Sequence, residues 1–332
     1  MSSVLHQYLA KQRNGVSSGI YSVCSAHPWV IRAAAEEAVS TESLLLVEAI
    51  SNQDNQIGGY TGMRPHSFRK LVEKHVHRAG LPLSSLILGG DHLGPNPWRS
   101  LPAAEAMKNA SVLVAEYVRA GFTKIHLDAS MSCNGDPAQL SDETVADRAL
   151  ELCQSAEAAR SSRDVANAPL YVIGTEVPTP GGAAHSLEEL RITTPSAAQQ
   201  TLEVHKRAFN RMGMTDVWSR VIALVVQPGV EFDHNSVIGY DPKRSALLCE
   251  WRKTQPDAIV FEAHAIDCQL PGAFQDLVRD GLLILKVGPA LTFAMREALY
   301  ALEDIEVQLS VKQPSRLAAV VESIMLKHPH NW

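Results

Sequence analysis

Residues 86–99 read LILGGDHLGPNPWR, an apolar run that passes through two glycines and ends in an acid and a histidine, Asp91 and His92. Two prolines, Pro95 and Pro97, come within the next five residues. The apolar run predicts a buried β-strand, and the prolines disfavour a helix directly after it. This stretch therefore predicts a strand that delivers a carboxylate and an imidazole to an irregular loop.

Seven further apolar runs occur along the chain, and segments with helical periodicity alternate with them. The runs are near-continuous rather than alternating, which is typical of parallel strands covered on both faces. Eight strands each followed by a helix predict an α/β fold, the (β/α)8 TIM barrel. The competing doubly wound sheet usually has about five or six strands. The predicted strands span residues 19–25, 43–49, 85–91, 124–130, 170–176, 220–226, 258–263 and 282–288.

The helical segments are marked by prolines in first turns and glycines at ends, as helices often are. No linker or low-complexity stretch divides the chain, so the sequence predicts one domain over residues 1–332 with a helical C-terminal extension. The predicted helices span residues 28–40, 64–80, 103–121, 141–160, 196–213, 242–255, 271–281 and 289–304.

Composition narrows the class of protein. The 332 residues carry a net charge of −6, which gives no support for nucleic acid or an anionic membrane as the main partner. No apolar run reaches the roughly 18 residues of a membrane span, and the polar start does not resemble a signal peptide. Five scattered cysteines without a CxxC pair suggest a reducing compartment. We therefore expect a cytoplasmic protein.

Polar or ionisable residues follow almost every predicted strand. A single acid at a strand end is as often a helix cap or an ion-pair partner as it is part of a functional site. Convergence of ionisable residues from six strands favours a functional site, because a barrel cannot bury so many charges unpaired and barrel enzymes place their chemistry at the carboxyl ends of the strands. In strand order from the second to the eighth, these residues are Glu48, Asp91 with His92, Asp128, Glu176, Gln227, Glu262 with His264, and Lys286.

Three of these residues, His92, Glu176 and His264, are of types that zinc accepts as ligands. They are far apart in the sequence, so the metal prediction depends on the barrel prediction. Asp91 beside a metal-bound His92 would lie where a general acid or base is needed. The two glycines before Asp91 are expected to let the backbone and a substrate approach closely.

A phosphate site is predicted at the end of the last strand, where barrels commonly bind phosphate on loop amides and a helix N-terminus. Lys286 and the Gly288 amide, with the helix that starts at Pro289, provide these groups. The turn with Gly181 and Gly182 adds further backbone N–H groups, although a flexible loop explains these two glycines equally well.

Five sequence blocks resemble the class II, zinc-dependent ketose-bisphosphate aldolases, and most of all the Z-subunit family of tagatose-bisphosphate aldolase. The resemblance implies a zinc site with His92 and His264 as ligands and Asp91 as the acid/base, with Glu176 and Asp128 at further family positions. The blocks are GGDHLGPNPW (89–98), KIHLDASM (124–131), GTEVPTPGGA (174–183), FEAHAID (261–267) and KVGPALTFA (286–294).

One departure from the aldolase pattern concerns the metal. The aldolases have a zinc-binding histidine after the sixth strand, where this chain has Gln227. Either Glu176 completes the ligand set, or Gln227 binds weakly, or His234 moves in, and a site without metal is a further alternative.

The resemblance leaves three activities: a tagatose 6-phosphate 4-epimerase, a non-catalytic stabilising subunit of the aldolase, and a tagatose-6-phosphate kinase. The kinase is disfavoured because no GxxxxGK[ST] phosphate loop occurs in the sequence. Epimerisation at C4 cannot proceed by simple deprotonation, since that hydrogen is not α to the C2 carbonyl. Cleavage and re-formation of the C3–C4 bond needs a Lewis acid and a base, which the predicted site offers.

The expected cofactor is therefore a divalent metal, with zinc preferred. The expected substrate is tagatose 6-phosphate, interconverted with fructose 6-phosphate, and the expected protein partners are a second copy of the chain and a catalytic aldolase subunit. Residues 51–63 form a polar, glycine-rich loop that is either a substrate lid or merely a mobile loop.

Overall fold

The computed structural model describes residues 4–13, 19–160, 168–174, 190–233, 235–255 and 259–329. The chain divides into two compact units, Met1–Val287 and Gly288–Trp332. The first unit contains all the strands, and the described part of the second consists of helices. That residues 1–332 act as one domain with a helical extension stays a prediction.

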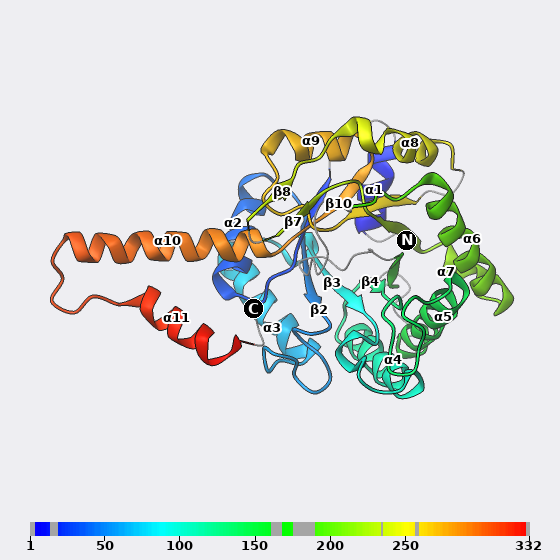
Figure 1. Ribbon diagram of the computed structural model, residues 1–332, viewed down its shortest axis with the longest axis horizontal. Coiled ribbons are helices and arrows are strands. Elements are labelled where there is room, and N and C mark those ends of the chain that lie inside the picture. Colours follow the sequence, from blue (N-terminus) through cyan, green and yellow to red (C-terminus); the bar gives the residue numbers. More distant parts are fainter. Residues whose placement is uncertain are drawn as a thin grey trace. The chain divides into compact units, whose positions relative to one another are not determined.

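Eight parallel strands close into a barrel, as the sequence predicts. Their order around the barrel is β1-β10-β9-β6-β5-β4-β3-β2, so each strand pairs with its neighbours in the chain and β1 closes on β10. Figure 1 shows helices arranged around these strands. The strands are β1 (Ile20–Val23), β2 (Leu45–Ile50), β3 (Leu86–Leu93), β4 (Lys124–Leu127), β5 (Leu170–Ile173), β6 (Val221–Val226), β9 (Val260–Ala263) and β10 (Leu282–Val287).

The helices of the first unit start at the places that the sequence marks. Proline occupies the first turn of five of them, and the Ser141 side chain accepts a hydrogen bond from the Thr144 N–H at the start of α5. The predicted helices correspond to α2 (Pro28–Ser40), α3 (Pro65–Ala79), α4 (Ala103–Arg119), α5 (Asp142–Ala159), α6 (Pro195–Arg211), α8 (Pro242–Lys253) and α9 (Pro271–Arg279).

Several short elements were not predicted, because two to four residues carry no readable periodicity. A 3₁₀ turn, η2, replaces a regular helix directly after β3, as the prolines of the opening stretch lead one to expect. The longer N-terminal helix α1 is also additional. These elements are α1 (Val4–Arg13), η1 (Leu83–Ser85), η2 (Asn96–Trp98), α7 (Thr215–Trp218) and the antiparallel pair β7 (Glu231–Phe232) and β8 (Val237–Ile238).

The barrel interior has two layers of different chemistry. Its amino-terminal half is an apolar cluster that includes Ile20, Leu46 and Val260 from the strands and Leu5 and Leu9 from α1. Two residues further along the strands, the buried side chains become polar, namely Ser22, Glu48 and Glu262. Because side chains on a strand alternate with a period of two, each of these three strands offers an apolar residue to the lower layer and a polar residue to the upper layer. The polar side chains at the carboxyl ends of the strands therefore lie next to a packed apolar layer.

The second unit contains two helices, α10 (Pro289–Gln308) and α11 (Leu317–Lys327). No residue of either helix is buried, and many of their large apolar side chains are exposed. No described helix is both long and apolar enough to cross a membrane.

Candidate functional site

A buried lysine organises the upper layer of the barrel. Lys124 on β4 is fully buried, and its Nζ lies 2.6 Å from Glu48 Oε1 and 2.8 Å from Glu262 Oε2. Burial lowers the pKa of Lys124, but the two carboxylates outweigh burial and raise it, so the ammonium stays charged. Gly89 leaves the room for this pair, since a Cβ there would lie 2.8 Å from Glu48 Cγ. The space at Gly89 thus holds the Glu48 side chain, although the sequence suggested an approach of backbone and substrate.

The end of β3 is irregular at the Asp-His pair. The register between β3 and β4 shifts between Gly90 and Leu93, and His92 has a φ of 47°. A regular strand turns consecutive side chains to opposite faces. With this left-handed residue, His92 Nε2 comes within 3.7 Å of Asp91 Oδ2, so both side chains belong to one site.

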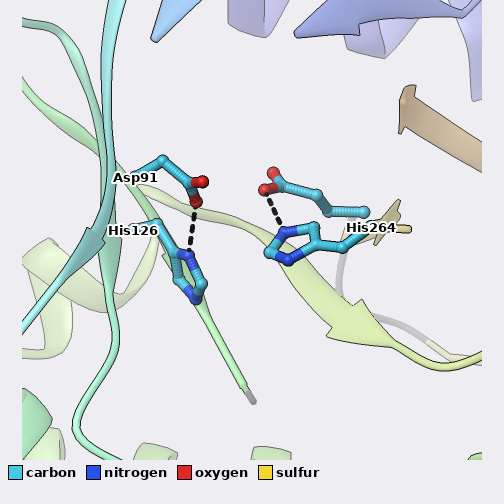
Figure 2. A group of neighbouring side chains, drawn as sticks. Asp91, His126 and His264 are labelled. Atoms are coloured by element: carbon cyan, nitrogen blue, oxygen red, sulfur yellow. Dashed lines mark hydrogen bonds and ion pairs between the residues drawn. The ribbon is translucent and has the colours of Figure 1, made fainter. Parts of the chain in front are cut away.

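Asp91 is the fully buried centre of the site. Its Oδ1 lies 2.9 Å from His126 Nδ1, and its Oδ2 forms an ion pair with Lys286 Nζ. Figure 2 shows the contact of Asp91 with His126, with His264 lying across from them. Burial raises the pKa of Asp91, but the interactions with His92, Lys286 and His126 outweigh burial, so this pKa lies well below its usual range.

Three imidazole rings surround this carboxylate. The ring centres are 5.1 Å apart for His92 and His126, 5.0 Å for His92 and His264, and 5.5 Å for His126 and His264. One nitrogen of each ring also lies within hydrogen-bond distance of an oxygen acceptor. The distances are 2.7 Å from His92 Nδ1 to Asp128 Oδ2, 3.1 Å from His126 Nε2 to Gly174 O, and 3.0 Å from His264 Nε2 to Glu262 Oε1.

Carboxylates outnumber ammonium groups in this cluster. Glu48 and Glu262 pair with Lys124, Asp91 pairs with Lys286, and Asp128 contacts His92. Burial raises the pKa of Glu48 above its usual value despite Lys124. Burial acts the same way on Glu262, but Lys124 and His264 outweigh it and bring that pKa down to about 2. Three carboxylates besides Glu48 thus share a buried site with two lysines and three imidazoles, and buried charges need such partners.

These residues fit a divalent metal ion. One ligand atom each from Asp91, His126, Glu262 and His264 lies within 4.8 Å of the others, and all four residues are buried. Burial lowers the pKa of His92, outweighing the opposite effect of Asp91, and a neutral imidazole is the form that binds metal. The donor set therefore suits a divalent metal, and Lys286 is a cationic neighbour of Asp91 that would compete with it.

The structure brings five of the predicted site residues together: Asp91, His92, Asp128, His264 and Lys286. Asp128 touches His92 and holds the Ser130 hydroxyl, and its pKa is lowered because hydrogen bonds from His92 and Ser130 outweigh burial.

Other predicted residues lie elsewhere. Gln227 follows β6, and its side chain turns to its own loop, where Oε1 accepts from the Gly229 N–H at 2.8 Å and the Val230 N–H at 3.0 Å. Gly288 is the N-cap residue of α10 in the second unit, whereas Lys286 belongs to the first. Outside the described residues lie Glu176, Gly181, Gly182 and His234.

Sequence reasoning missed Lys124 and His126. Both lie in KIHLDAS, which the apolar pattern predicts to be a strand that ends in Asp128. The alternation of Lys124, His126 and Asp128 puts all three on one face of β4, and a charged residue in an otherwise buried strand needs a partner. That spacing was the available signal.

The fold and the site define the class of the protein as a (β/α)8 barrel of the aldolase-like kind, with ionisable residues at the carboxyl ends of the strands. The chain belongs to the D-tagatose-1,6-bisphosphate aldolase subunit GatZ/KbaZ-like family, whose model matches residues 5–332.

The chain is similar to several solved structures. The chain is similar to a probable tagatose 6 phosphate kinase from Sinorhizobium meliloti 1021, with 47% identity, a TM-score of 0.86, and 95% of this chain and 76% of that chain covered. A fructose-bisphosphate aldolase from Campylobacter jejuni shares the fold at 15% identity and a TM-score of 0.59, covering 92% and 81% of the two chains. A putative fructose-1,6-biphosphate aldolase from Coccidioides immitis also shares the fold, at 16% identity and a TM-score of 0.55, with 86% of this chain and 81% of that chain covered.

Proposed function

We propose that the chain is a ketose-phosphate 4-epimerase that interconverts tagatose 6-phosphate and fructose 6-phosphate by cleaving and re-forming the C3–C4 bond. The observation that carries this proposal is the buried Asp91 carboxylate, which lies among His92, His126 and Lys286 at the carboxyl end of a barrel strand. Membership of an aldolase-subunit family supports the choice of a ketose phosphate as substrate.

Asp91 is the proposed acid/base. As a carboxylate it would take the proton of the C4 hydroxyl while the C3–C4 bond breaks, giving a three-carbon enediolate and glyceraldehyde 3-phosphate. The aldehyde would turn within the site and present its other face, and the C3 carbon would attack it again. Asp91 then returns the proton to the new C4 oxygen. No atom is gained or lost, and the configuration at C4 is inverted.

His92 and His264 would hold a divalent metal, together with Glu176 as the sequence predicts. When bound, the metal supplies the Lewis acid that stabilises negative charge on the C2 and C3 oxygens. Asp128 fixes the ring of His92 through the 2.7 Å contact to Nδ1. Lys286 holds the Asp91 carboxylate in place, and it is also the proposed phosphate contact, as the sequence predicts.

The proposal is tested with the purified chain alone. Tagatose 6-phosphate labelled with deuterium at C4 is incubated with and without Zn²⁺, and the products are followed by NMR. We expect fructose 6-phosphate that retains the deuterium, because bond cleavage leaves the C4 hydrogen in place. Loss of the label to solvent would contradict this route, and absence of turnover with every divalent metal would contradict the activity.

The substitution Asp91→Asn tests the role of the carboxylate. Removal of a general acid/base typically lowers the rate by about 100- to 10,000-fold, and we expect a kcat loss of this size with little change in KM. Ser132→Ala, which alters an exposed hydroxyl bound to the Pro137 carbonyl, serves as the control. Epimerisation by Asp91→Asn at the wild-type rate would remove Asp91 from the mechanism.

A second candidate function is that of an accessory subunit that stabilises a catalytic D-tagatose-1,6-bisphosphate aldolase chain. The family description and the exposed apolar side chains of α10 and α11 favour it. Its test is to mix the chain with an aldolase subunit and to measure the half-life of aldolase activity at raised temperature. A longer half-life from a chain that shows no turnover by itself would favour the accessory role over the epimerase.

A further inference from the structure

The side chain of Gln227 has one bonded end and one open end. Its Oε1 accepts hydrogen bonds from the Gly229 N–H at 2.8 Å and the Val230 N–H at 3.0 Å. Its Nε2 is buried, and in the part of the chain that the structure describes no acceptor lies within hydrogen-bond distance of it. A buried donor without a partner is costly and uncommon. This nitrogen is therefore a candidate contact for an oxygen of a ligand.

The two bonds to Oε1 fix the direction in which the amide points. A carboxamide accepts through its oxygen and donates through its nitrogen. Turning the group by 180° would place its N–H donors against the N–H groups of Gly229 and Val230, so the orientation is set by the protein itself. The open end then offers N–H donors, which suit an oxygen acceptor and do not bind a metal ion.

The strand register places this amide beside the candidate site. Val226 on β6 is aligned with Ala263 on β9, and one step further along the same register Gln227 comes beside His264. Val225 belongs to the apolar cluster inside the barrel, and side chains alternate with a period of two. Gln227 therefore starts on the interior face, and it is buried as His264 is.

The next strand around the barrel carries a second donor at this level. Leu285 on β10 is aligned with Ala263, so Lys286 comes beside His264 on its other side. Lys286 pairs with Asp91, the proposed acid/base. A substrate that reaches Asp91 therefore lies in the same layer of the barrel as the open amide of Gln227.

We propose that Gln227 binds the substrate, with Nε2 donating a hydrogen bond to a hydroxyl or carbonyl oxygen of the ketose phosphate. The residue then contributes to specificity, because a sugar without an oxygen at this point leaves the buried donor unpaired. This inference rests on the proposed function for the identity of the substrate, but binding of the sugar is measured without turnover.

The variant Gln227→Glu tests the contact, because it changes only the open end of the side chain. One carboxylate oxygen still accepts from Gly229 and Val230, and the other replaces the N–H donors. Binding of tagatose 6-phosphate and fructose 6-phosphate to the full-length chain is measured by calorimetry, and KM is measured wherever turnover occurs. We expect binding to weaken about 10- to 100-fold, with thermal unfolding close to that of wild type.

Gln269→Glu is the matched control. Gln269 is also a buried carboxamide, but both of its ends are bonded within the protein. Its Oε1 accepts from the Tyr240 N–H and its Nε2 donates to the Ile238 carbonyl, both at 2.9 Å. Gln269→Glu should lower the unfolding temperature, because a carboxylate oxygen would face that carbonyl, and should bind both sugars like wild type. The two variants are thus expected to show opposite patterns.

A second measurement covers the case in which Gln227→Glu does not fold, as judged by circular dichroism. The wild-type chain is labelled with ¹⁵N in its glutamine side chains, and their amide signals are assigned by triple-resonance NMR. Addition of fructose 6-phosphate should shift the Nε2 signal of Gln227 and leave that of Gln269 in place.

The outcomes separate this inference from the proposed function. Wild-type affinity in a folded Gln227→Glu variant, or a Gln227 signal that does not respond while the sugar binds, overturns the inference, as does a wild-type chain that binds neither sugar. Epimerisation with the wild-type KM in Gln227→Glu overturns it and leaves the proposed function standing. A chain that shows the expected binding changes and does not epimerise does the reverse.

Discussion

The backbone of a single residue, His92, decides that the Asp-His pair acts at one site. Its φ of 47° lies in the left-handed region, which costs a non-glycine residue of the order of 1–3 kcal/mol. As a result, His92 Nε2 and Asp91 Oδ2 lie 3.7 Å apart, although a regular strand would turn these two side chains to opposite faces. Non-glycine residues with positive φ persist where the surroundings hold them, and here the Asp128 carboxylate binds the ring and the His92 N–H donates to His126 Nδ1.

We predict that a side chain at position 89 lowers the stability of the protein, for a steric reason. A Cβ at this position would meet the buried Glu48 side chain, 2.8 Å from its Cγ, and displace the carboxylate that pairs with Lys124. We expect Gly89→Ala to lower the free energy of unfolding by about 1–3 kcal/mol, measured by urea denaturation. Gly239→Ala is the control, because nothing lies near a Cβ there. Equal stability of the two variants would contradict this account.

Asp54 gives a pH-dependent prediction. Burial raises its pKa from 3.8 to about 6, against the effect of the Thr61 hydroxyl. Native protein then binds more protons than unfolded protein between these values, so this residue lowers stability as the pH rises through that window. Asp54→Asn removes the effect while its Oδ1 still accepts from Thr61.

We therefore expect the stability of Asp54→Asn relative to wild type to increase by about 1–3 kcal/mol between pH 4 and pH 7, measured by urea denaturation at each pH. The comparison across pH is needed because the new amide also brings a cost that does not vary with pH. Asp304→Asn, at an exposed position, should show no such trend. A constant difference between Asp54→Asn and wild type would contradict the raised pKa.

At the scale of elements, α1 determines where the site can be. Leu5 and Leu9 belong to the apolar cluster of the lower barrel, and the Tyr8 hydroxyl donates to the Gly19 carbonyl at the start of β1. The amino-terminal half of the barrel is therefore filled by side chains. Buried polar residues are left to the carboxyl half, where loops offer them partners.

Leu9→Ala tests this role of the helix. Leu9 is fully buried, and truncation of such a residue costs about 2–5 kcal/mol. We expect a loss of this size in thermal or urea unfolding, with kcat unchanged at a temperature where the variant is folded. Val4→Ala, at a side chain that is 47% exposed on the same helix, should cost far less. A small effect of Leu9→Ala would show that α1 does not support the barrel.

At the scale of the molecule, the second unit has exposed apolar side chains on one face of α10. Leu302, Ile305 and Leu309 follow the i, i+3, i+7 spacing of one helix face, and all are more than half exposed. An apolar stripe of this kind is typical of an interface. It fits the prediction of a homo-oligomer and also the accessory role.

The double substitution Leu302→Asp with Ile305→Asp should convert an oligomer into a monomer, because a charge in a buried interface is not solvated. Light scattering on a sizing column measures the mass, and circular dichroism checks the fold. Leu247→Asp on α8 alters a single exposed apolar side chain and serves as control. A wild-type chain that is monomeric at micromolar concentration would contradict the prediction of self-association.

The sequence by itself determined the barrel, because eight apolar runs and the helices between them repeat a pattern that few folds accommodate. The sequence also predicts Asp91, His92, Asp128, His264 and Lys286 as site residues, since each lies at or just after the carboxyl end of a strand. These inferences rest on the order of apolar and polar residues along the chain and on the position of barrel loops at the carboxyl ends of the strands.

Only the tertiary structure decided how these side chains meet. The left-handed turn at His92 and the pairing of Lys124 with Glu48 and Glu262 depend on register across strands, which no local pattern records. His126 reads in the sequence as one residue of a buried strand, and it becomes a candidate ligand because the closed barrel sets its ring about 5 Å from two others. Closure brings together residues that are distant along the chain, and their distances follow from packing rather than from sequence.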